Sequence, residues 1–235
     1  RTMRQGDIMA PGAGRKADIL LFSRKTLYQG ALRENRDARL RKLILGRHRA
    51  VACLRRADAE HTRTVDVITR LLDRYGFSYR FVYDLKGHRP EQYGLVMTIG
   101  GDGTVLFASH HVERTPLLGV NSSPSTSAGY LTSATRANLE SKLRLLREGR
   151  IRRTRLNRLA VFVDGELEDD RVLNDVLFTA SCPAVTARYF LTVGKTGEEQ
   201  MSSGIWIGPA AGSTAALLSA GGRVLPPGSK RVQFV

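Results

Sequence analysis

The stretch LVMTIGGDGT, residues 95–104, decides the fold of this chain. It opens with a continuous apolar run of the length of a buried β-strand, and two glycines follow at once. Apolar residues resume from Val105 onward, so we expect a helix over residues 105–112. A buried strand that passes through glycines into a helix is typical of α/β folds with a parallel sheet.

On either side of this stretch, strands and helices alternate. Short apolar or alternating runs predict strands over residues 18–22, 77–83 and 116–120. Helical composition or spacing predicts helices over residues 31–45, 60–75 and 137–148, whereas residues 50–54 fit either state. We therefore expect an α/β domain with a parallel sheet over residues 16–148, preceded by a flexible leader of residues 1–15.

The second half of the chain has a different pattern, in which short strand-like runs are separated by glycines and polar turns. These runs cover residues 159–163, 176–178, 189–193 and 205–207, and one later helix is expected over residues 213–220. We expect a β-rich, sandwich-like domain over residues 149–235. The chain ends inside a strand-like stretch, residues 231–235, so we expect the natural protein to continue and this domain to be incomplete.

The composition is that of a soluble globular protein, with 42% hydrophobic and 25% charged residues. No apolar run has the length needed to span a bilayer. Two cysteines, Cys53 and Cys182, suit a reducing compartment and indicate neither a disulfide framework nor a metal site. These features predict a cytoplasmic protein that is not bound to a membrane.

The net charge of +15 is carried largely by arginine, in clusters that include residues 33–41 and 150–155. Such clusters can neutralise the phosphates of nucleic acid. However, no aromatic residues interleave them as stacking platforms, and no nucleic-acid module is recognisable. A basic field also attracts small polyanions such as ATP, and the sequence favours this interpretation over nucleic acid.

The glycine turn itself, Gly100-Gly101-Asp102-Gly103, is the strongest candidate for chemistry. Glycines between a strand and a helix allow backbone N–H groups to approach an anion. A carboxylate beside phosphates is unfavourable unless Asp102 accepts a proton from an attacking hydroxyl or holds a phosphate-bound metal. The competing interpretation is a plain turn in which Asp102 caps the following helix.

Two further segments can contact a nucleotide. Residues 211–215 contain a Gly-Ser-Thr sequence before an apolar helix, which offers N–H groups and hydroxyls to an anion or a ribose, or simply caps that helix. The polar pair Asn174-Asp175 lies between apolar residues and suits paired hydrogen bonds to ribose hydroxyls, although a β-turn explains it equally well. The Gly-x-x-x-x-Gly-Lys motif of P-loop enzymes is absent.

Taken together, these segments resemble the NAD kinase family in order and rough spacing. The resemblance rests on Gly100 to Thr104, on Gly119-Val120-Asn121, on Leu173-Asn174-Asp175, and on Gly212-Ser213-Thr214-Ala215 followed by Ser219-Ala220-Gly221-Gly222. It runs from about residue 17 to the end of the chain. The first motif is shared with diacylglycerol and sphingosine kinases, whereas its combination with the last block is much more specific.

The resemblance implies an α/β domain followed by a β-rich dinucleotide domain, in a homodimer or homotetramer. It also implies an enzyme that transfers the ATP γ-phosphoryl group to the adenosine 2′-hydroxyl of NAD⁺ or NADH with Mg²⁺, and so makes NADP(H). Asp102 would be the general base. No side chain other than Asp102 would contact the Mg²⁺. Phosphate or nucleotide contacts would come from Gly100, Gly101, Gly103, Thr104 and Asn121, and dinucleotide contacts from Asn174, Asp175, Gly212, Ser213, Thr214, Ala215 and Ser219.

Several positions depart from the common form of the family. The block Gly208 to Ala216 lacks hydroxyls and an aromatic residue that are usual there, Ser203 replaces an aspartate, and Asp175 replaces a glutamate. These departures, with Cys182-Pro183-Ala184, are similar to the plant NADH kinase and animal mitochondrial NAD kinase branch. NADH is then an alternative acceptor to NAD⁺.

Two alternatives stay open at this point. A lipid kinase of the diacylglycerol or sphingosine type would use the same Asp102 turn. A non-catalytic nucleotide sensor or basic nucleic-acid binder would keep the fold without the reaction.

Overall fold

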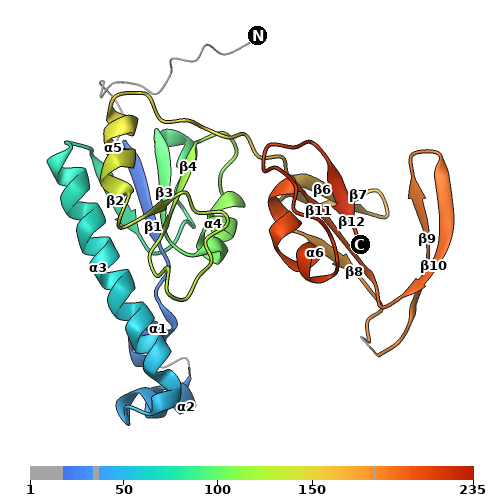
Figure 1. Cartoon of the computed structure of the whole chain (residues 1–235), viewed down its shortest axis with the longest axis horizontal. Helices are drawn as coiled ribbons and strands as arrows, with labels where there is room; N and C mark the ends of the chain where they lie inside the picture. The colour runs from blue at the N-terminus through green and yellow to red at the C-terminus, as the bar shows by residue number, and fades with distance from the viewer. Residues whose placement is uncertain (1–17, 34–36, 183) are drawn as a thin grey trace. The chain divides into compact units, whose positions relative to one another are not determined.

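The computed structural model describes residues 18–33, 37–182 and 184–235 (Figure 1). Its contacts divide the chain into two compact units, one that ends at Arg153 and one that runs from Thr154 to Val235. The expected leader, residues 1–15, lies outside the described residues. The two units are described separately below.

The first unit is built on a five-stranded parallel sheet in the order β2-β1-β3-β4-β5. The strands are β1 (Ile19–Ser23), β2 (Tyr79–Val82), β3 (Leu95–Gly100), β4 (Leu117–Asn121) and β5 (Ala134–Thr135). Four of them were predicted, and the two-residue β5 was not. The expected parallel α/β fold is confirmed.

Apolar side chains pack on both faces of this sheet, which explains why β1 and β3 have continuous apolar sequences. Successive residues of a strand point to opposite faces. Ile19 and Leu21 accordingly pack with the helices α3 (Ala52–Arg74) and α5 (Leu139–Arg147), whereas Leu20 and Phe22 pack in a second cluster with α4 (Asp102–Ser109). Figure 1 shows α3 and α5 on one side of the sheet and α4 on the other.

The strand order changes direction between β1 and β3. From β1 the chain passes to β2 at one edge, and β3 then pairs with the opposite side of β1. Ligands of open α/β sheets bind beyond the carboxyl ends of the strands at such a reversal. Ser23 ends β1 and Gly100 ends β3, so the glycine turn lies at the position where this fold binds ligands.

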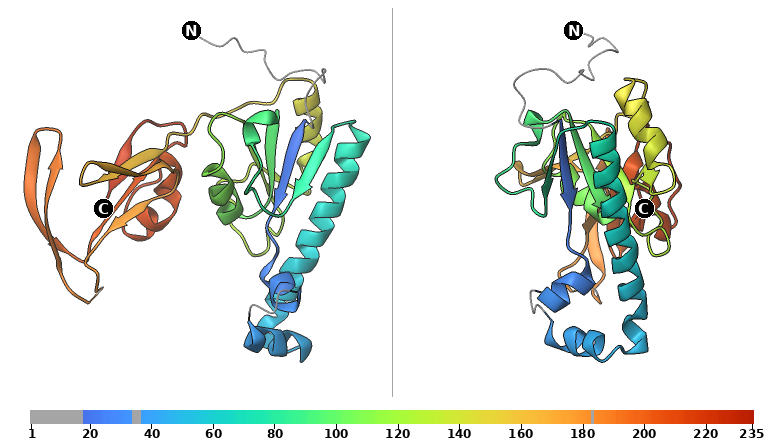
Figure 2. Two further views of the ribbon diagram at one scale, coloured as in Figure 1. Left: turned by 180° about the vertical axis from the view of Figure 1, so that it is seen from behind. Right: turned by 90° about the vertical axis from the view of Figure 1, so that its left-hand side faces the viewer.

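The helices between β1 and β2 differ from the prediction. The helix expected over residues 31–45 is two helices, α1 (Leu27–Arg33) and α2 (Ala38–Leu45), because Asp37 caps a new helix by accepting the N–H of Leu40. The helix expected over residues 60–75 begins earlier, at Ala52, after the short 3₁₀ helix η1 (Arg49–Val51). Figure 2 shows α1 and α2 at the N-terminal end of α3.

The remaining elements of the first unit are short. A 3₁₀ helix, η2 (Pro90–Gln92), precedes β3, and α4 begins at Asp102 rather than at the expected residue 105. Because the first turn of a helix contributes no apolar residue here, its start was not visible in the hydrophobic pattern.

The second unit contains antiparallel strands, in agreement with the predicted β-rich domain. They are β6 (Leu159–Val163), β7 (Glu166–Val172), β8 (Val176–Phe178), β9 (Ala187–Val193), β10 (Thr196–Ser202), β11 (Ile205–Pro209) and β12 (Val232–Phe234). β6 pairs with β7, β9 pairs with β10, and β11 lies between β8 and β12. The strands β7 and β10 were not predicted, because both are rich in glutamate and other polar residues.

The helix expected over residues 213–220 is interrupted. A 3₁₀ helix, η3 (Ala210–Thr214), is followed by one turn of α-helix, α6 (Ala216–Ser219). The break falls at Ala215, whose ψ of −132° is not helical.

The packing of α3 against the sheet gives a first testable prediction. Leu72 is fully buried in α3, so Leu72→Ala removes apolar contacts and leaves a cavity. We expect the free energy of unfolding of this unit to fall by about 2–5 kcal/mol in urea denaturation. Leu45→Ala, at a helical leucine that is 63% exposed, is the matched control and should change it by less than about 0.5 kcal/mol. Equal losses in the two variants would contradict the packing described here.

Candidate active site

The turn after β3 uses its glycines in two ways. A Cβ atom at Gly100 would collide with the side chain of Thr104, and one at Gly101 would lie 2.5 Å from the Ser127 hydroxyl. At Gly103, by contrast, a Cβ atom would meet nothing within 4 Å. The first two glycines therefore let the turn pack closely, and Gly103 keeps the outer side of the turn open.

Gly101 is the N-cap residue of α4, and the helix begins with Asp102 and Gly103. The first N–H groups of an α-helix have no carbonyl partner within the helix, and the helix dipole adds partial positive charge there. The open side of Gly103 gives an anion access to these groups. The phosphate contacts expected at this turn stay a prediction.

The Asp102 carboxylate does not cap α4. It accepts hydrogen bonds from the loop between β4 and β5: the Tyr130 N–H donates to Oδ2 over 2.9 Å, and the Leu131 N–H donates to Oδ1 over 2.7 Å. An ionised carboxylate has about four acceptor positions, so each oxygen keeps one for a further donor. Asp102 is partly exposed and can meet a ligand.

Asn121 ends β4 and holds the loop that reaches Asp102. Its side-chain amide donates to the Ser127 carbonyl over 3.0 Å, and its Oδ1 accepts the Ser123 N–H over 3.2 Å. Asn121 is 4% exposed. The expected nucleotide contact is thus brought next to the glycine turn, with its side chain engaged inside the loop.

His61 of α3 is a buried polar residue that the sequence did not single out. One ring nitrogen, Nε2, lies 3.0 Å from the Ser23 hydroxyl, and the other, Nδ1, lies 2.9 Å from the Ser122 hydroxyl. Burial lowers the pKa of the His61 imidazole below its usual value, although the nearby Asp58 carboxylate acts in the opposite direction. His61 therefore joins the ends of β1 and β4 as a neutral ring.

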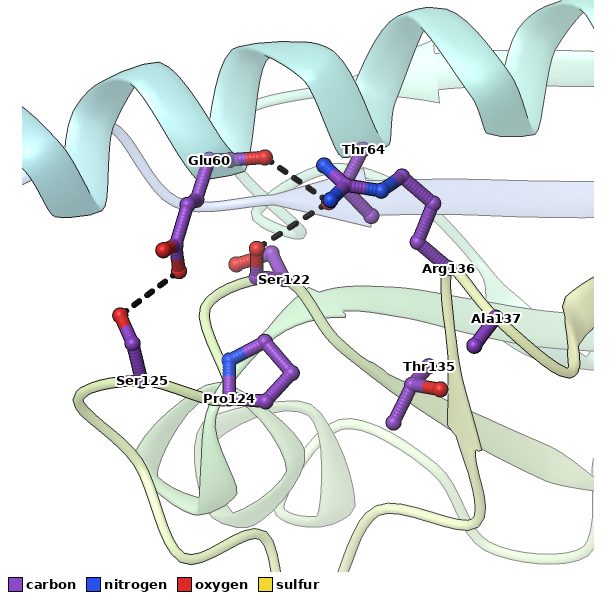
Figure 3. A pocket seen from close by; sticks show the side chains of 8 residues that line it. All are labelled: Glu60, Thr64, Ser122, Pro124, Ser125, Thr135, Arg136 and Ala137. Atoms are coloured by element: carbon purple, nitrogen blue, oxygen red, sulfur yellow. Dashed lines mark hydrogen bonds between the residues drawn. The ribbon is translucent and has the colours of Figure 1, made fainter.

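A polar cavity of about 340 Å³ opens beside this loop (Figure 3). Glu60 and Thr64 of α3 line one side, and Arg136 follows β5 on the other. The remaining lining residues are Ser122, Pro124, Ser125, Thr135 and Ala137. Glu60, Thr64 and Arg136 carried no functional signal in the sequence.

In the second unit, Asn174 and Asp175 form the bend between β7 and β8 rather than part of a strand. The Asn174 amide donates to Asp175 Oδ1 over 3.1 Å, and Asp175 Oδ2 accepts the Ala216 N–H at the start of α6 over 3.1 Å. A Cβ atom at Gly212 would collide with the Asn174 carbonyl. The structure therefore brings the two predicted segments of this unit into direct contact.

The other predicted residues near Gly212 differ in accessibility. Ser213 is fully buried; its hydroxyl donates to the Ala210 carbonyl over 2.7 Å and accepts the Leu225 N–H over 2.9 Å. Thr214 and Ala215 are partly exposed, and Ser219 is exposed. The Ser213 side chain thus serves the local fold, and the surface is formed by its neighbours.

Within the described ranges, 18–33, 37–182 and 184–235, no three side chains of His, Cys, Asp or Glu come together as a metal site. Over the same ranges, no helix is both long and apolar enough to cross a bilayer.

Comparison with known proteins places this geometry in a family. Residues 42–151 match the ATP-NAD kinase N-terminal domain. A probable NADH kinase of Oryza sativa subsp. japonica is 34% identical over 198 residues, which cover 74% of this chain and 61% of that protein. Residues 42–151 thus belong to the N-terminal domain of the ATP-NAD kinase family.

Further members support this assignment and the predicted similarity to plant NADH kinases. An NADH kinase of Arabidopsis thaliana is 37% identical over 171 residues, which cover 63% of this chain and 54% of that protein. A crystal structure of an NAD kinase from Archaeoglobus fulgidus in complex with ATP shares the fold with a TM-score of 0.61 at 19% identity, over 92% of this chain and 70% of that one. These proteins give no support to a lipid kinase or a nucleic-acid binder.

The chain spans less than two thirds of the length of these plant relatives, 61% of the rice protein and 54% of the Arabidopsis protein. The matched domain contains the glycine turn, Asp102 and the loop that binds it. The family assignment therefore rests on the part of the chain that carries the candidate active site.

The buried His61 predicts a pH dependence of stability. Its pKa is lowered in the folded protein, whereas in the unfolded chain it is about 6.5. As the pH falls below about 6.5, the unfolded chain therefore takes up a proton that the folded protein does not, and stability decreases. In urea unfolding at pH 7.5, 6.5 and 5.5, we expect His61→Gln to reduce the loss seen at low pH.

Leu45→Ala, at an exposed residue with no titratable group, provides the control for this experiment and should leave the pH dependence as it is in the unmodified protein. If His61→Gln also left it unchanged, the buried neutral state of His61 would be refuted.

The contact between Gly212 and Asn174 gives a third prediction. Gly212→Ala forces a methyl group against the Asn174 carbonyl, so the bend and η3 must separate. We expect the second unit to lose about 1–3 kcal/mol of stability, measured by denaturant unfolding. Gly228→Ala is the control in the same unit, because the nearest atom would lie at an ordinary contact distance of 3.7 Å. A Gly212→Ala variant as stable as Gly228→Ala would contradict the described contact.

Proposed function

We propose that this protein is an NAD(H) kinase, which transfers the γ-phosphoryl group of ATP to the adenosine 2′-hydroxyl of NAD⁺ or NADH. The observation that carries the proposal is the Asp102 carboxylate, held at the open start of α4 inside the domain that matches the family. Phosphoryl transfer depends mainly on positioning and charge stabilisation, and this site offers both.

Asp102 acts as the general base for the 2′-hydroxyl. Its two loop hydrogen bonds fix the position of the carboxylate, and each oxygen keeps an acceptor position for the substrate. The proton of the attacking hydroxyl passes to this carboxylate as the oxygen bonds to phosphorus. A carboxylate that backbone groups hold in place is pre-positioned for this proton transfer.

The phosphates bind to the turn. The N–H groups of Asp102 and Gly103 lie in the first turn of α4 and would donate to a phosphate, for which Gly103 leaves room. Gly100, Gly101 and Thr104 shape the turn, and Asn121 supports it through the adjacent loop. The net charge of +15 adds a general attraction for polyphosphate ligands.

The Asp102 carboxylate at the glycine turn fits the way in which nucleotide-dependent enzymes hold Mg²⁺. Mg²⁺ keeps several waters and takes one or two carboxylates together with substrate phosphates, so a dedicated cluster of protein ligands is not required. Asp102 is the carboxylate that would contact it. When bound, Mg²⁺ neutralises the charge that develops on the phosphates.

The dinucleotide binds to the second unit. Asn174 and Asp175 offer an amide and a carboxylate for ribose hydroxyls, and both are partly exposed. Thr214, Ala215 and Ser219 provide the neighbouring accessible surface, while Gly212 and the buried Ser213 shape it. NADH is an expected acceptor beside NAD⁺, because the plant relatives are named NADH kinases.

We also propose that the enzyme is cytoplasmic and acts as a homodimer or homotetramer. Both cysteines are exposed and free, which suits a reducing compartment. The second unit exposes large apolar side chains, among them Phe162, Phe178, Phe190 and Met201, each more than half exposed. Another protein surface, such as a second copy of this chain, could cover these side chains.

The proposed reaction is tested by Asp102→Asn, which keeps the shape of the side chain but removes the base. We expect kcat for formation of NADP(H) from ATP and NAD(H) to fall by at least about 100-fold, with substrate binding by calorimetry changed little.

The matched control is Asp66→Asn, the same chemical change at an exposed position on α3. It should leave kcat unchanged. Retention of full activity in Asp102→Asn would exclude Asp102 as the base, and an unmodified protein that made no NADP(H) would exclude the proposed function.

A further inference from the structure

The position of Asp102 depends on a loop that is itself anchored elsewhere. The carboxylate of Asp102 is bound by Tyr130 and Leu131 near the end of the loop over residues 122–133. The N–H groups of Tyr130 and Leu131 can hold the Asp102 carboxylate in place only if the loop itself is held in place. The anchors of this loop therefore decide where the proposed base lies.

Ser123 is the centre of the hydrogen bonds inside the loop. Its carbonyl accepts the N–H groups of Thr126 and Ser127, over 3.0 and 3.1 Å, and its hydroxyl accepts the Thr126 hydroxyl over 2.9 Å. Ser127 in turn lies against Gly101 of the active-site turn. Ser123 is thus bonded to a residue that borders the active-site turn.

Helix α3 holds Ser123 through Glu60. Oε2 of Glu60 accepts the Ser123 hydroxyl over 2.7 Å and the Ser125 hydroxyl over 2.8 Å; Figure 3 shows the bond to Ser125. The hydrogen bonds from these two serines lower the pKa of the Glu60 carboxyl, against the effect of its burial. The side chain is only 15% exposed, and its further partner is Arg56 at 3.5 Å.

Other α3 residues hold the loop one residue earlier. The Thr64 hydroxyl donates to the Ser122 carbonyl over 3.1 Å, and His61 contacts the Ser122 hydroxyl. Both contacts lie next to the strand end, where β4 already fixes the backbone. Glu60 alone among these three residues binds the part of the loop that extends away from the sheet.

We propose that Glu60 is a positioning residue of this active site: its carboxylate fixes the loop over residues 122–133, and this loop fixes Asp102. The inference rests on the proposed function of Asp102, but the loop contact itself does not. Glu60 touches neither Asp102 nor the glycine turn in the hydrogen bonds of the structure, so it acts only through the loop.

Steady-state kinetics of Glu60→Ala test the proposal. Misplacement of a catalytic group by about 1 Å can cost roughly 100-fold in rate, so we expect kcat to fall about 10- to 100-fold. The KM values for ATP and NAD(H) should stay within about twofold, because the substrate contacts remain. Glu60→Gln keeps one acceptor oxygen and should retain part of the lost rate, whereas the control Asp66→Ala, on the same helix, should behave as the unmodified protein.

A double variant separates positioning from a general structural role. If Glu60 acts through Asp102, then Glu60→Ala should cause little further loss of rate when Asp102→Asn is already present. A structural role would instead lower the rate by the same factor in both backgrounds, and that result would overturn the proposal.

Hydrogen exchange gives a readout that does not depend on catalysis. In Glu60→Ala, the amides of Tyr130 and Leu131 should exchange at least about fivefold faster, while the amides of the β3 core should not change. Unchanged exchange at these two amides overturns the proposal. If the unmodified protein lacks kinase activity but exchange responds as expected, the proposed function fails and the role of Glu60 in fixing the loop stands.

Discussion

Two backbone amides bind one carboxylate, and the amides lie 28 and 29 residues beyond it in the chain. These bonds tie the turn after β3 to the loop after β4, with Asp102 between them. The close approach explains why Gly101 has no room for a side chain, since Ser127 occupies that space. It also gives Asn121 its role, because the Asn121 amide holds Ser127 in place.

The parallel sheet creates this arrangement. Because β3 and β4 run in the same direction and are hydrogen-bonded neighbours, both connections leave at the same edge, and Gly100 pairs in register with Asn121. Helix α3 supplies Glu60, His61 and Thr64 to the loop after β4. The position of the Asp102 carboxylate thus depends on three segments that are distant in sequence.

The sequence predicts those parts of the fold whose burial is visible in local composition. Strands β1, β3 and β4 are apolar because helices cover both faces, whereas β7 and β10 have largely exposed, polar side chains and become recognisable only through their partners. The glycine turn, Asn174-Asp175, Gly212 and Ser213 were all predicted as site residues. The motif does not reveal that Gly212 packs against the Asn174 carbonyl or that the Ser213 hydroxyl bonds within its own segment. Glu60 carries no signal at all, since its serine partners lie 63 and 65 residues away.

The central claim is that Asp102 directs phosphoryl transfer to the adenosine 2′-hydroxyl of a dinucleotide. Phosphorus NMR of a mixture of the protein, ATP, Mg²⁺ and NADH tests it most directly, because it reports both the transfer and the position of the new phosphate. We expect a new monoester resonance that matches authentic NADPH, with an equal amount of ADP. Formation of ADP without that resonance, or a phosphate on another hydroxyl, would contradict it.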